Sequence, residues 1–366
     1  MCIRDRYGGA IYSDPGSSFT PTITTSTFYQ NKSTGQGGAI YVQSGKITIT
    51  QSSFQENQGT EGGAVYSTSS TTTTIRGSSF SDNQAADGGA LQLLANTVTT
   101  LSSTSFTGNK ATSSTGGAIA ASGTSLSLTS STFTTGSATN GGGIYLTTGT
   151  LSVTGGAFTQ NSSTTGAGIY FTGTVLNVNG ASFSQNAATG NGGALFFNNG
   201  ASRGVIRNCS LVKNTALSNG AGLYATASKQ LHLVDNLFQE NVATVNGGAT
   251  YFAVSNQAAF INNTLLGNSA VKGAHLYVQP STNTLLLQNI LAYATAGEAV
   301  YAEAVSARVL SWYNNFYQDV GGEFGGSATN ILGVRGNLNV DPRFTSYSAD
   351  GNLSNDTLTF QTGSAM

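Results

Sequence analysis

The sequence predicts an all-β fold, a parallel β-helix in which the chain winds into about 12 or 13 stacked coils of about 26 residues each. Three observations predict it. A GGAIY-type motif recurs along the chain, an FxxN motif recurs between its copies, and runs of alternating apolar and polar residues separate the two motifs. This period is too short for a propeller blade and lacks the 3.6-residue spacing of helical repeats.

The GGAIY-type motif sets the period, because it covers 289 residues in 11 intervals from Gly8 to Gly297, or 26.3 residues per repeat. Its copies start at Gly8, Gly37, Gly62, Gly88, Gly116, Gly141, Gly166, Gly192, Gly220, Gly247, Gly273 and Gly297. The paired glycines are expected to supply a positive φ, or a close approach between backbones, where the next strand begins.

The alternating runs, such as Lys46–Thr50 and Thr124–Thr129, have the period of two that is typical of strands. Each coil is expected to hold about three short strands, and stacked coils should rise by about 4.8 Å.

The FxxN motif predicts two stacks of side chains. Phe in a fixed column should point inward and stack on the Phe of the next coil. Asn three residues later should take the left-handed conformation of a sharp corner, and its amide should bond to the Asn of neighbouring coils. The predicted ladder residues are Phe28, Phe54, Phe80, Phe106, Asn31, Asn57, Asn83, Asn109, Asn161, Asn186 and Asn241. Degenerate copies have Gly136 in place of Asn, and Leu211 and Leu265 in place of Phe.

The two ends of the chain depart from the repeat. Residues 1–6 resemble the translation of a sequencing-library adapter and are set aside, so the natural amino terminus is expected to be missing. Residues 7–326 are assigned to the β-helix. Residues 327–366 are expected to be an irregular, truncated closing segment that covers the open end, because an uncovered end exposes unpaired backbone groups.

Composition argues against two classes of partner. With 14 Lys and Arg residues, 15 acidic residues and a net charge of -1, the chain lacks the basic surface that nucleic-acid binding requires. It has no run of 18 or more apolar residues that could cross a membrane as a helix. Its two cysteines, Cys2 and Cys209, form no metal-binding pattern.

Six GGA[ILV] and seven FxxN copies are intact, and this density resembles the repeat of the chlamydial polymorphic outer-membrane proteins and related bacterial adhesin-like β-helix proteins. The resemblance covers roughly residues 7–301. It implies an extracellular right-handed β-helix, often exported as an autotransporter, that serves adhesion or surface display. The segment from Asn337 to Ser364 resembles the closing element of secreted bacterial β-helix proteins, with a DPxF turn at Asp341–Phe344.

An enzyme would need acid and base groups on one face, and the sequence offers two candidate regions. No charged residue occurs between residues 111 and 202, which excludes the middle coils. In the first region, Glu56 and Asp82 share one column, and Glu61 and Asp87 share another. Three interpretations stay open: solvated or Lys-paired loop carboxylates, a Ca²⁺ site, and a glycosidase pair. Ca²⁺ is the one cofactor for which the sequence offers ligands.

The second region is a coil of high charge density. Its residues are Arg203, Arg207, Lys213, Lys229, His232, Asp235 and Glu240. Alignment of the repeats places Lys213 beside Glu240, which predicts a surface ion pair. His232 lies between two leucines and should point outward, as an exposed polar residue or a general base. His275 replaces the Ala of GGAIY, and no second His or Cys lies within reach to form a metal site.

Tyr recurs at the fifth position of the GGAIY-type motif, which predicts a stripe of phenol rings. The rings are Tyr12, Tyr41, Tyr66, Tyr145, Tyr170, Tyr224, Tyr251, Tyr277 and Tyr301. A buried stripe would be a packing ladder, whereas an exposed stripe could stack on sugar rings or on a partner protein.

Taken with the resemblance, these patterns predict a secreted or cell-surface β-helix of structural or adhesin-like role. It should bind cell-surface glycans or proteins through its lateral faces, with no residue assigned to catalysis. The alternative is a carbohydrate-active β-helix enzyme, a pectate-lyase-like polysaccharide lyase or hydrolase.

Overall fold

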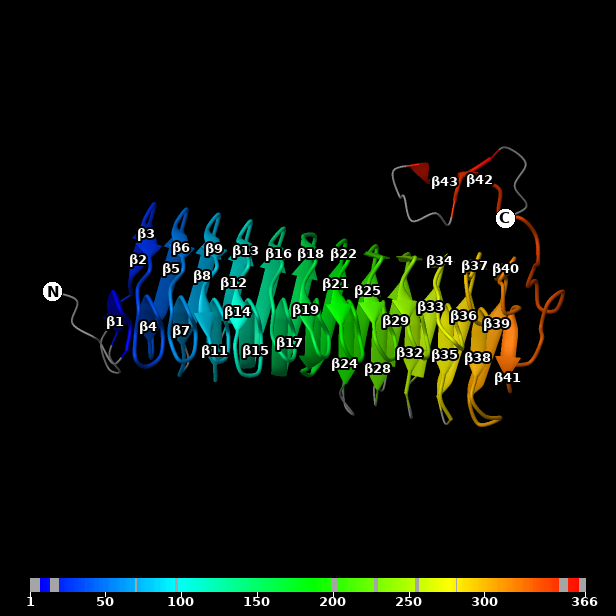
Figure 1. Ribbon diagram of the computed structural model, residues 1–366, viewed down its shortest axis with the longest axis horizontal. Helices are drawn as coiled ribbons and strands as arrows, with labels where there is room; N and C mark the ends of the chain where they lie inside the picture. Colours follow the sequence, from blue (N-terminus) through cyan, green and yellow to red (C-terminus); the bar gives the residue numbers. More distant parts are fainter. Residues whose placement is uncertain are drawn as a thin grey trace.

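The computed structural model describes residues 7–13, 20–69, 71–95, 98–198, 203–226, 230–253, 257–280, 282–348 and 355–361. Within these residues the chain forms 43 β-strands and no α-helix. The strands pair in parallel between successive coils, and Figure 1 shows the coils stacked along one axis. This confirms the predicted all-β parallel β-helix. The adapter-like residues 1–6 lie outside the described residues.

Each coil contributes one strand to each of three columns. The first column follows the paired glycines: β1 (Ile11–Ser13), β4 (Ile40–Val42), β7 (Val65–Ser67), β11 (Leu91–Leu94), β20 (Ile169–Thr172), β24 (Leu195–Asn198), β28 (Leu223–Thr226), β32 (Thr250–Phe252), β35 (Leu276–Val278), β38 (Val300–Ala302) and β41 (Phe324–Gly326). The second column holds the alternating runs: β2 (Thr22–Thr24), β5 (Lys46–Thr50), β8 (Thr72–Arg76), β12 (Val98–Ser102), β21 (Val175–Asn179), β25 (Arg203–Arg207), β29 (Gln230–Val234), β33 (Gln257–Ile261), β36 (Asn283–Leu287) and β39 (Arg308–Trp312). Strands β15 (Ile119–Thr129) and β17 (Ile144–Thr154) run through both columns and join them into one 23-stranded sheet.

The third column is a separate 12-stranded sheet, called the Phe sheet from here on. Its strands are β3 (Thr27–Tyr29), β6 (Ser53–Gln55), β9 (Ser79–Ser81), β13 (Ser105–Thr107), β16 (Thr132–Thr134), β18 (Ala157–Thr159), β22 (Ser182–Ser184), β26 (Ser210–Val212), β30 (Leu237–Gln239), β34 (Thr264–Leu266), β37 (Ile290–Ala292) and β40 (Asn315–Tyr317). Short strands follow some of these corners: β10 (Gln84–Ala85), β14 (Lys110–Ala111), β19 (Ser162–Ser163), β23 (Ala187–Ala188), β27 (Thr215–Ala216) and β31 (Val242–Ala243).

The Phe rings form one file through the core. Phe54 pairs in register with Phe28 on one side and Phe80 on the other. From Phe28 to Phe183, successive ring centroids lie 4.6–5.0 Å apart with nearly parallel planes. The spacing equals one coil rise, so each ring covers the faces of its neighbours and no single coil could bury its own ring.

The Asn side chains form a buried hydrogen-bonded ladder beside the Phe file. Asn57 Oδ1 accepts from the backbone N of Asn31 at 3.0 Å and from its Nδ2 at 2.8 Å. Asn57 Nδ2 in turn donates to Asn83 Oδ1 at 2.9 Å and to the Phe28 carbonyl at 3.0 Å. Where Gly136 replaces Asn, only its backbone N donates, to Asn161 Oδ1 at 2.9 Å. Each complete rung therefore satisfies both polar groups of its own side-chain amide, and also a backbone N and a backbone carbonyl of the preceding coil.

The predicted left-handed conformation of the ladder Asn is wrong. The residue with positive φ is the one before it, as at Gln30 (+54°), Glu56 (+54°) and Asp82 (+53°). The Asn side chain must turn into the corner to bond the next rung, so the preceding residue makes the turn and points outward. The paired glycines behave as predicted. Gly62 has φ of +62°, and a Cβ on Gly63 would collide with the Gly89 carbonyl oxygen.

A second Asn ladder, not predicted from the sequence, runs along the corner between the second column and the Phe sheet. Its rungs are Asn236, Asn263, Asn289, Asn314 and Asn337. Asn236 Nδ2 donates to Asn263 Oδ1 at 2.9 Å, with the same geometry as in the first ladder. In the amino-terminal coils this corner carries hydroxyl residues instead, and Ser52 N donates to Ser78 Oγ at 3.1 Å.

The carboxy-terminal segment first packs against the end of the core and then returns along the last coils. Ala328 and Leu332 pack against the main core, and Asn337 forms the last rung of the second ladder. The chain then folds back, and the antiparallel strands β42 (Phe344–Ser346) and β43 (Thr357–Phe360) lie beside the last coils, in red in Figure 1. We call the described residues 341–348 and 355–361 the hairpin segment. The covering of the open end was predicted, whereas this packing on a lateral face was not.

Candidate functional site

The four carboxylates of the first region lie on neighbouring coils, as their columns imply. Glu61 and Asp87 form a parallel β-bridge with each other. Asp87 Oδ1 accepts from the N and the Oγ1 of Thr115, at 2.9 and 2.6 Å, while Glu61 accepts from Gln36 Nε2 at 3.0 Å. Glu56 is exposed and accepts from Gln30 Nε2 at 2.8 Å. In the part of the chain that the structure describes, no ion pair joins these groups to Lys32 or Lys110.

The Ca²⁺ site stays a prediction. Among the described residues no three His, Cys, Asp or Glu side chains come close enough together to hold a metal. If Glu56, Glu61, Asp82 and Asp87 bind Ca²⁺, the melting temperature should rise on addition of Ca²⁺ and fall with EDTA. That response should disappear in the Glu61→Gln, Asp87→Asn variant. Thermal unfolding curves of the wild-type chain that coincide with and without EDTA would contradict the site.

The charged coil contains the predicted ion pair, since Lys213 Nζ lies 3.9 Å from Glu240 Oε2. His232, Arg203 and Arg207 are exposed on the second column, and the outward direction predicted for His232 is confirmed. Lys229 lies outside the described residues. His232 pairs in register with Val205 and Ala259, so β25 and β33 place no acid directly opposite its imidazole.

His275 has a partner that the sequence did not suggest. Its Nε2 lies 3.0 Å from Asp319 Oδ1, and neither side chain is exposed to solvent. Asp319 follows Phe316 by three residues and so stands at an Asn rung of the first ladder; its Oδ1 accepts from Ala294 N at 2.7 Å. Ala294 stands at the rung between Asn268 and Asp319 and has no side-chain amide. The His275 imidazole takes the place of that amide and contacts the rungs on both sides.

Hydrogen bonding fixes the tautomer of His275. Asn268 Oδ1 accepts from the N and Nδ2 of Asn241, so Asn268 Nδ2 faces the imidazole and lies 3.1 Å from its Nδ1. The donor of Asn268 requires Nδ1 to be the acceptor, and the hydrogen on Nε2 is then donated to Asp319. The pair completes an interior ladder with no access from solvent, and we assign it a structural role.

The Tyr stripe lies on the outer side of the first column and is mostly covered. Successive rings stack with centroids 4.9–5.3 Å apart, as for Tyr41 and Tyr66 or Tyr251 and Tyr277. Tyr66 is 5% exposed and Tyr277 is 4% exposed. The stripe is interrupted at Gln92 and Ala120, which pair in register with Tyr66 and Tyr145. The buried rings agree with the packing interpretation.

Burial raises the pKa of Tyr66 to about 12, and the nearby Glu61 carboxylate adds to the effect. In the unfolded chain a Tyr ionises near pH 10. Between pH of about 10 and 12 the unfolded state therefore loses a proton that the folded state keeps, so stability should be intact below this window and fall as pH rises through it. Denaturation midpoints measured across this window should fall less steeply for Tyr66→Phe; an equal slope in both proteins would contradict the assignment.

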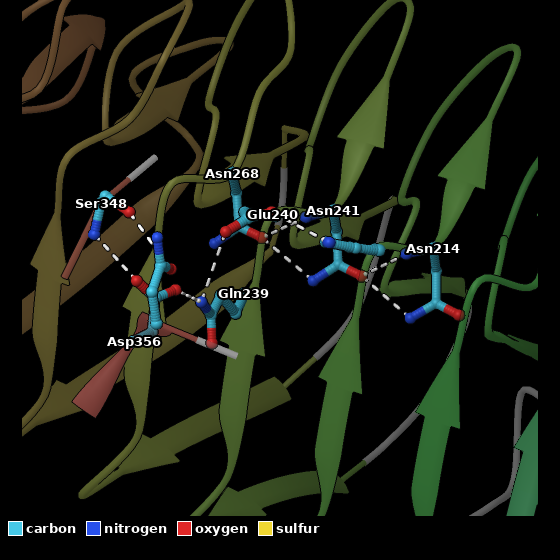
Figure 2. Close-up of polar contacts among 9 residues, drawn as sticks. Asn214, Gln239, Glu240, Asn241, Asn268, Ser348 and Asp356 are labelled. Atoms are coloured by element: carbon cyan, nitrogen blue, oxygen red, sulfur yellow. Dashed lines mark hydrogen bonds and ion pairs between the residues drawn. The ribbon is translucent and has the colours of Figure 1, made fainter. Parts of the chain in front are cut away.

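The hairpin segment is held against the Phe sheet by polar and apolar contacts, drawn in part in Figure 2. Asp356 Oδ2 accepts from Gln239 Nε2 at 2.7 Å, and its Oδ1 accepts from Ser348 N at 2.8 Å. Beneath it, Leu266, Ile290 and Ala292 form an apolar cluster with Phe344. The corresponding positions of the amino-terminal coils are polar, as at Ser53 and Gln55 of β6, so the face changes where the hairpin segment covers it.

Comparison with protein families gives one match. A family model described as right handed beta helix region matches residues 9–174 and 95–265. A search of curated proteins and a search of solved structures found no match. Among the described residues, no helix has the length and apolar character needed to cross a membrane.

Proposed function

The chain belongs to the right-handed β-helix family, and from this premise we propose that it is a secreted or cell-surface protein with an adhesin-like role. It binds glycans or proteins of a neighbouring cell through its lateral faces and performs no catalysis. Export by an autotransporter-like route belongs to the same proposal, which draws on the resemblance to polymorphic outer-membrane proteins.

The observation that carries this proposal is the regular, polar and uncharged lateral surface of the middle coils. Thr100, Ser127 and Ser152 stand in register on successive strands of the second column. No charged residue occurs between residues 111 and 202. General acid and base catalysis needs carboxyl or imidazole groups at such a surface. The Asp87 carboxylate instead bonds to Thr115 of the next coil, and Asp319 completes a buried ladder.

The test is binding of the purified chain to intact cells and to an array of neutral and acidic glycans. We expect saturable binding without release of new reducing ends or unsaturated sugars. Formation of such products would favour the carbohydrate-active enzyme, and binding to neither cells nor glycans would contradict the adhesin-like role. Immunolabelling of unpermeabilised source cells tests the surface location.

A further inference from the structure

A hollow with a cavity volume of about 780 Å³ lies between the hairpin segment and the coils. It has two unlike sides. One side is a row of polar residues at the corner between the second column and the Phe sheet, and the other is mainly apolar.

The polar side is the row Asp235, Asn262, Gln288 and Tyr313. Each of these exposed residues precedes a rung of the second Asn ladder and has φ between +55° and +56°. Asn262 Nδ2 donates to Asp235 Oδ1. At the same corner the coils of the uncharged middle region carry small residues: Ser130, Gly155 and Gly180. Long polar side chains thus replace small ones on the coils beside the hairpin segment.

The apolar side combines the Phe sheet with the hairpin segment. Leu237 and Ile290 line the cavity from β30 and β37, and Phe344 and Leu358 line it from β42 and β43. On the amino-terminal coils the residue at the position of Leu237 is Ser, as at Ser79 of β9. The corner row and part of the Phe sheet therefore change character on the same coils, and Thr264 and Asn315 of the Phe sheet add polar groups to the same lining.

We propose that this hollow is a binding groove for a segment of a neutral glycan. A pyranose ring has an apolar face of C–H groups and a rim of hydroxyls, and the groove offers aliphatic and aromatic groups opposite amide, carboxylate and phenol groups. Among the described residues that line the groove, Asp235 is the one charged residue, so an anionic sugar or a phosphate would meet no cation there. The row repeats about every 4.8 Å, close to the length of one sugar unit, so four coils span about three units.

This proposal rests on the proposed function and specifies its ligand. The test uses the full chain and three probes, which are hexasaccharides of β-1,4-linked glucose, N-acetylglucosamine and mannose, titrated by calorimetry. We expect at least one to bind. The variant Asn262→Ala, Gln288→Ala should bind it about tenfold more weakly, because two hydrogen-bonding amides are removed. The matched control is Gln51→Ala, an exposed amide at the same corner of an amino-terminal coil.

The outcomes separate the groove from the wider function. Absence of binding by all three hexasaccharides, or equal weakening in the control, would overturn the groove. If the double variant still binds cells and glycans as the wild type does, the groove is wrong while the adhesin-like role stands. If the chain binds a hexasaccharide in the groove and cleaves it, the groove stands while the non-catalytic role is wrong.

Discussion

Replacing His275 with Ala is expected to destabilise the carboxy-terminal coils by about 3–5 kcal/mol, because the change leaves a buried carboxylate without its main partner. Asp319 Oδ1 would keep only the Ala294 N, and Asn268 Nδ2 would lose the Nδ1 acceptor. Because coils of a solenoid contact only their neighbours, the loss should be local. Hydrogen exchange should therefore speed up at Asn268 and Ala294, with little change in the amino-terminal coils.

A rescue variant tests the cause of this loss. His275→Ala, Ala294→Asn, Asp319→Asn places Asn at two rungs where the other coils carry it, and it should recover most of the stability through an uninterrupted amide ladder. His232→Ala, on the exposed face, is the control and should change stability by less than about 0.5 kcal/mol. A triple variant no more stable than His275→Ala would show that the imidazole does not substitute for a rung.

The comparison of His275 with the Phe file shows which features the sequence reveals. The period, the stacked Phe rings, the first Asn ladder and the glycine turns recur in most coils, so a pattern repeated along the chain identifies them. Asp319 lies 44 residues from His275, and no repeat relates the two. The sequence signal was a pair of exceptions, Ala at one Asn rung and His at an Ala position, which become complementary only once the coils are stacked.

The packing on the lateral face was also harder to predict, because most of its contacts join residues that no repeat relates. The second Asn ladder has a detectable signal, an Asn two residues before the Phe or Leu column at Asn236, Asn263 and Asn289. The packing of the hairpin segment depends on contacts far apart in sequence, such as Gln239 with Asp356, and follows from no repeat. The groove depends on that packing. The proposed groove therefore lies where the regularity of the coils ends.

The largest effect expected in the core comes from Phe106→Ala. Phe106 is 1% exposed and stacks between Phe80 and Phe133 at 5.0 and 4.9 Å. Loss of the ring removes two stacking contacts and leaves a cavity in a file that neighbouring coils cannot close, because their backbones are held at one strand spacing. The expected cost is about 3–5 kcal/mol, measured by chemical denaturation followed by circular dichroism.

Phe106→Leu is the matched control, because Leu211, Leu265 and Leu291 occupy the same column and are fully buried there. A coil that accepts Leu without rearrangement should lose less than about 1.5 kcal/mol. Equal losses for Ala and Leu would mean that the aromatic stack itself, rather than the filling of the column, stabilises the rod. The amino-terminal coils, with unbroken Phe from Phe28 to Phe183, would then be more stable than the carboxy-terminal coils, where Leu211, Leu265 and Leu291 interrupt the Phe file.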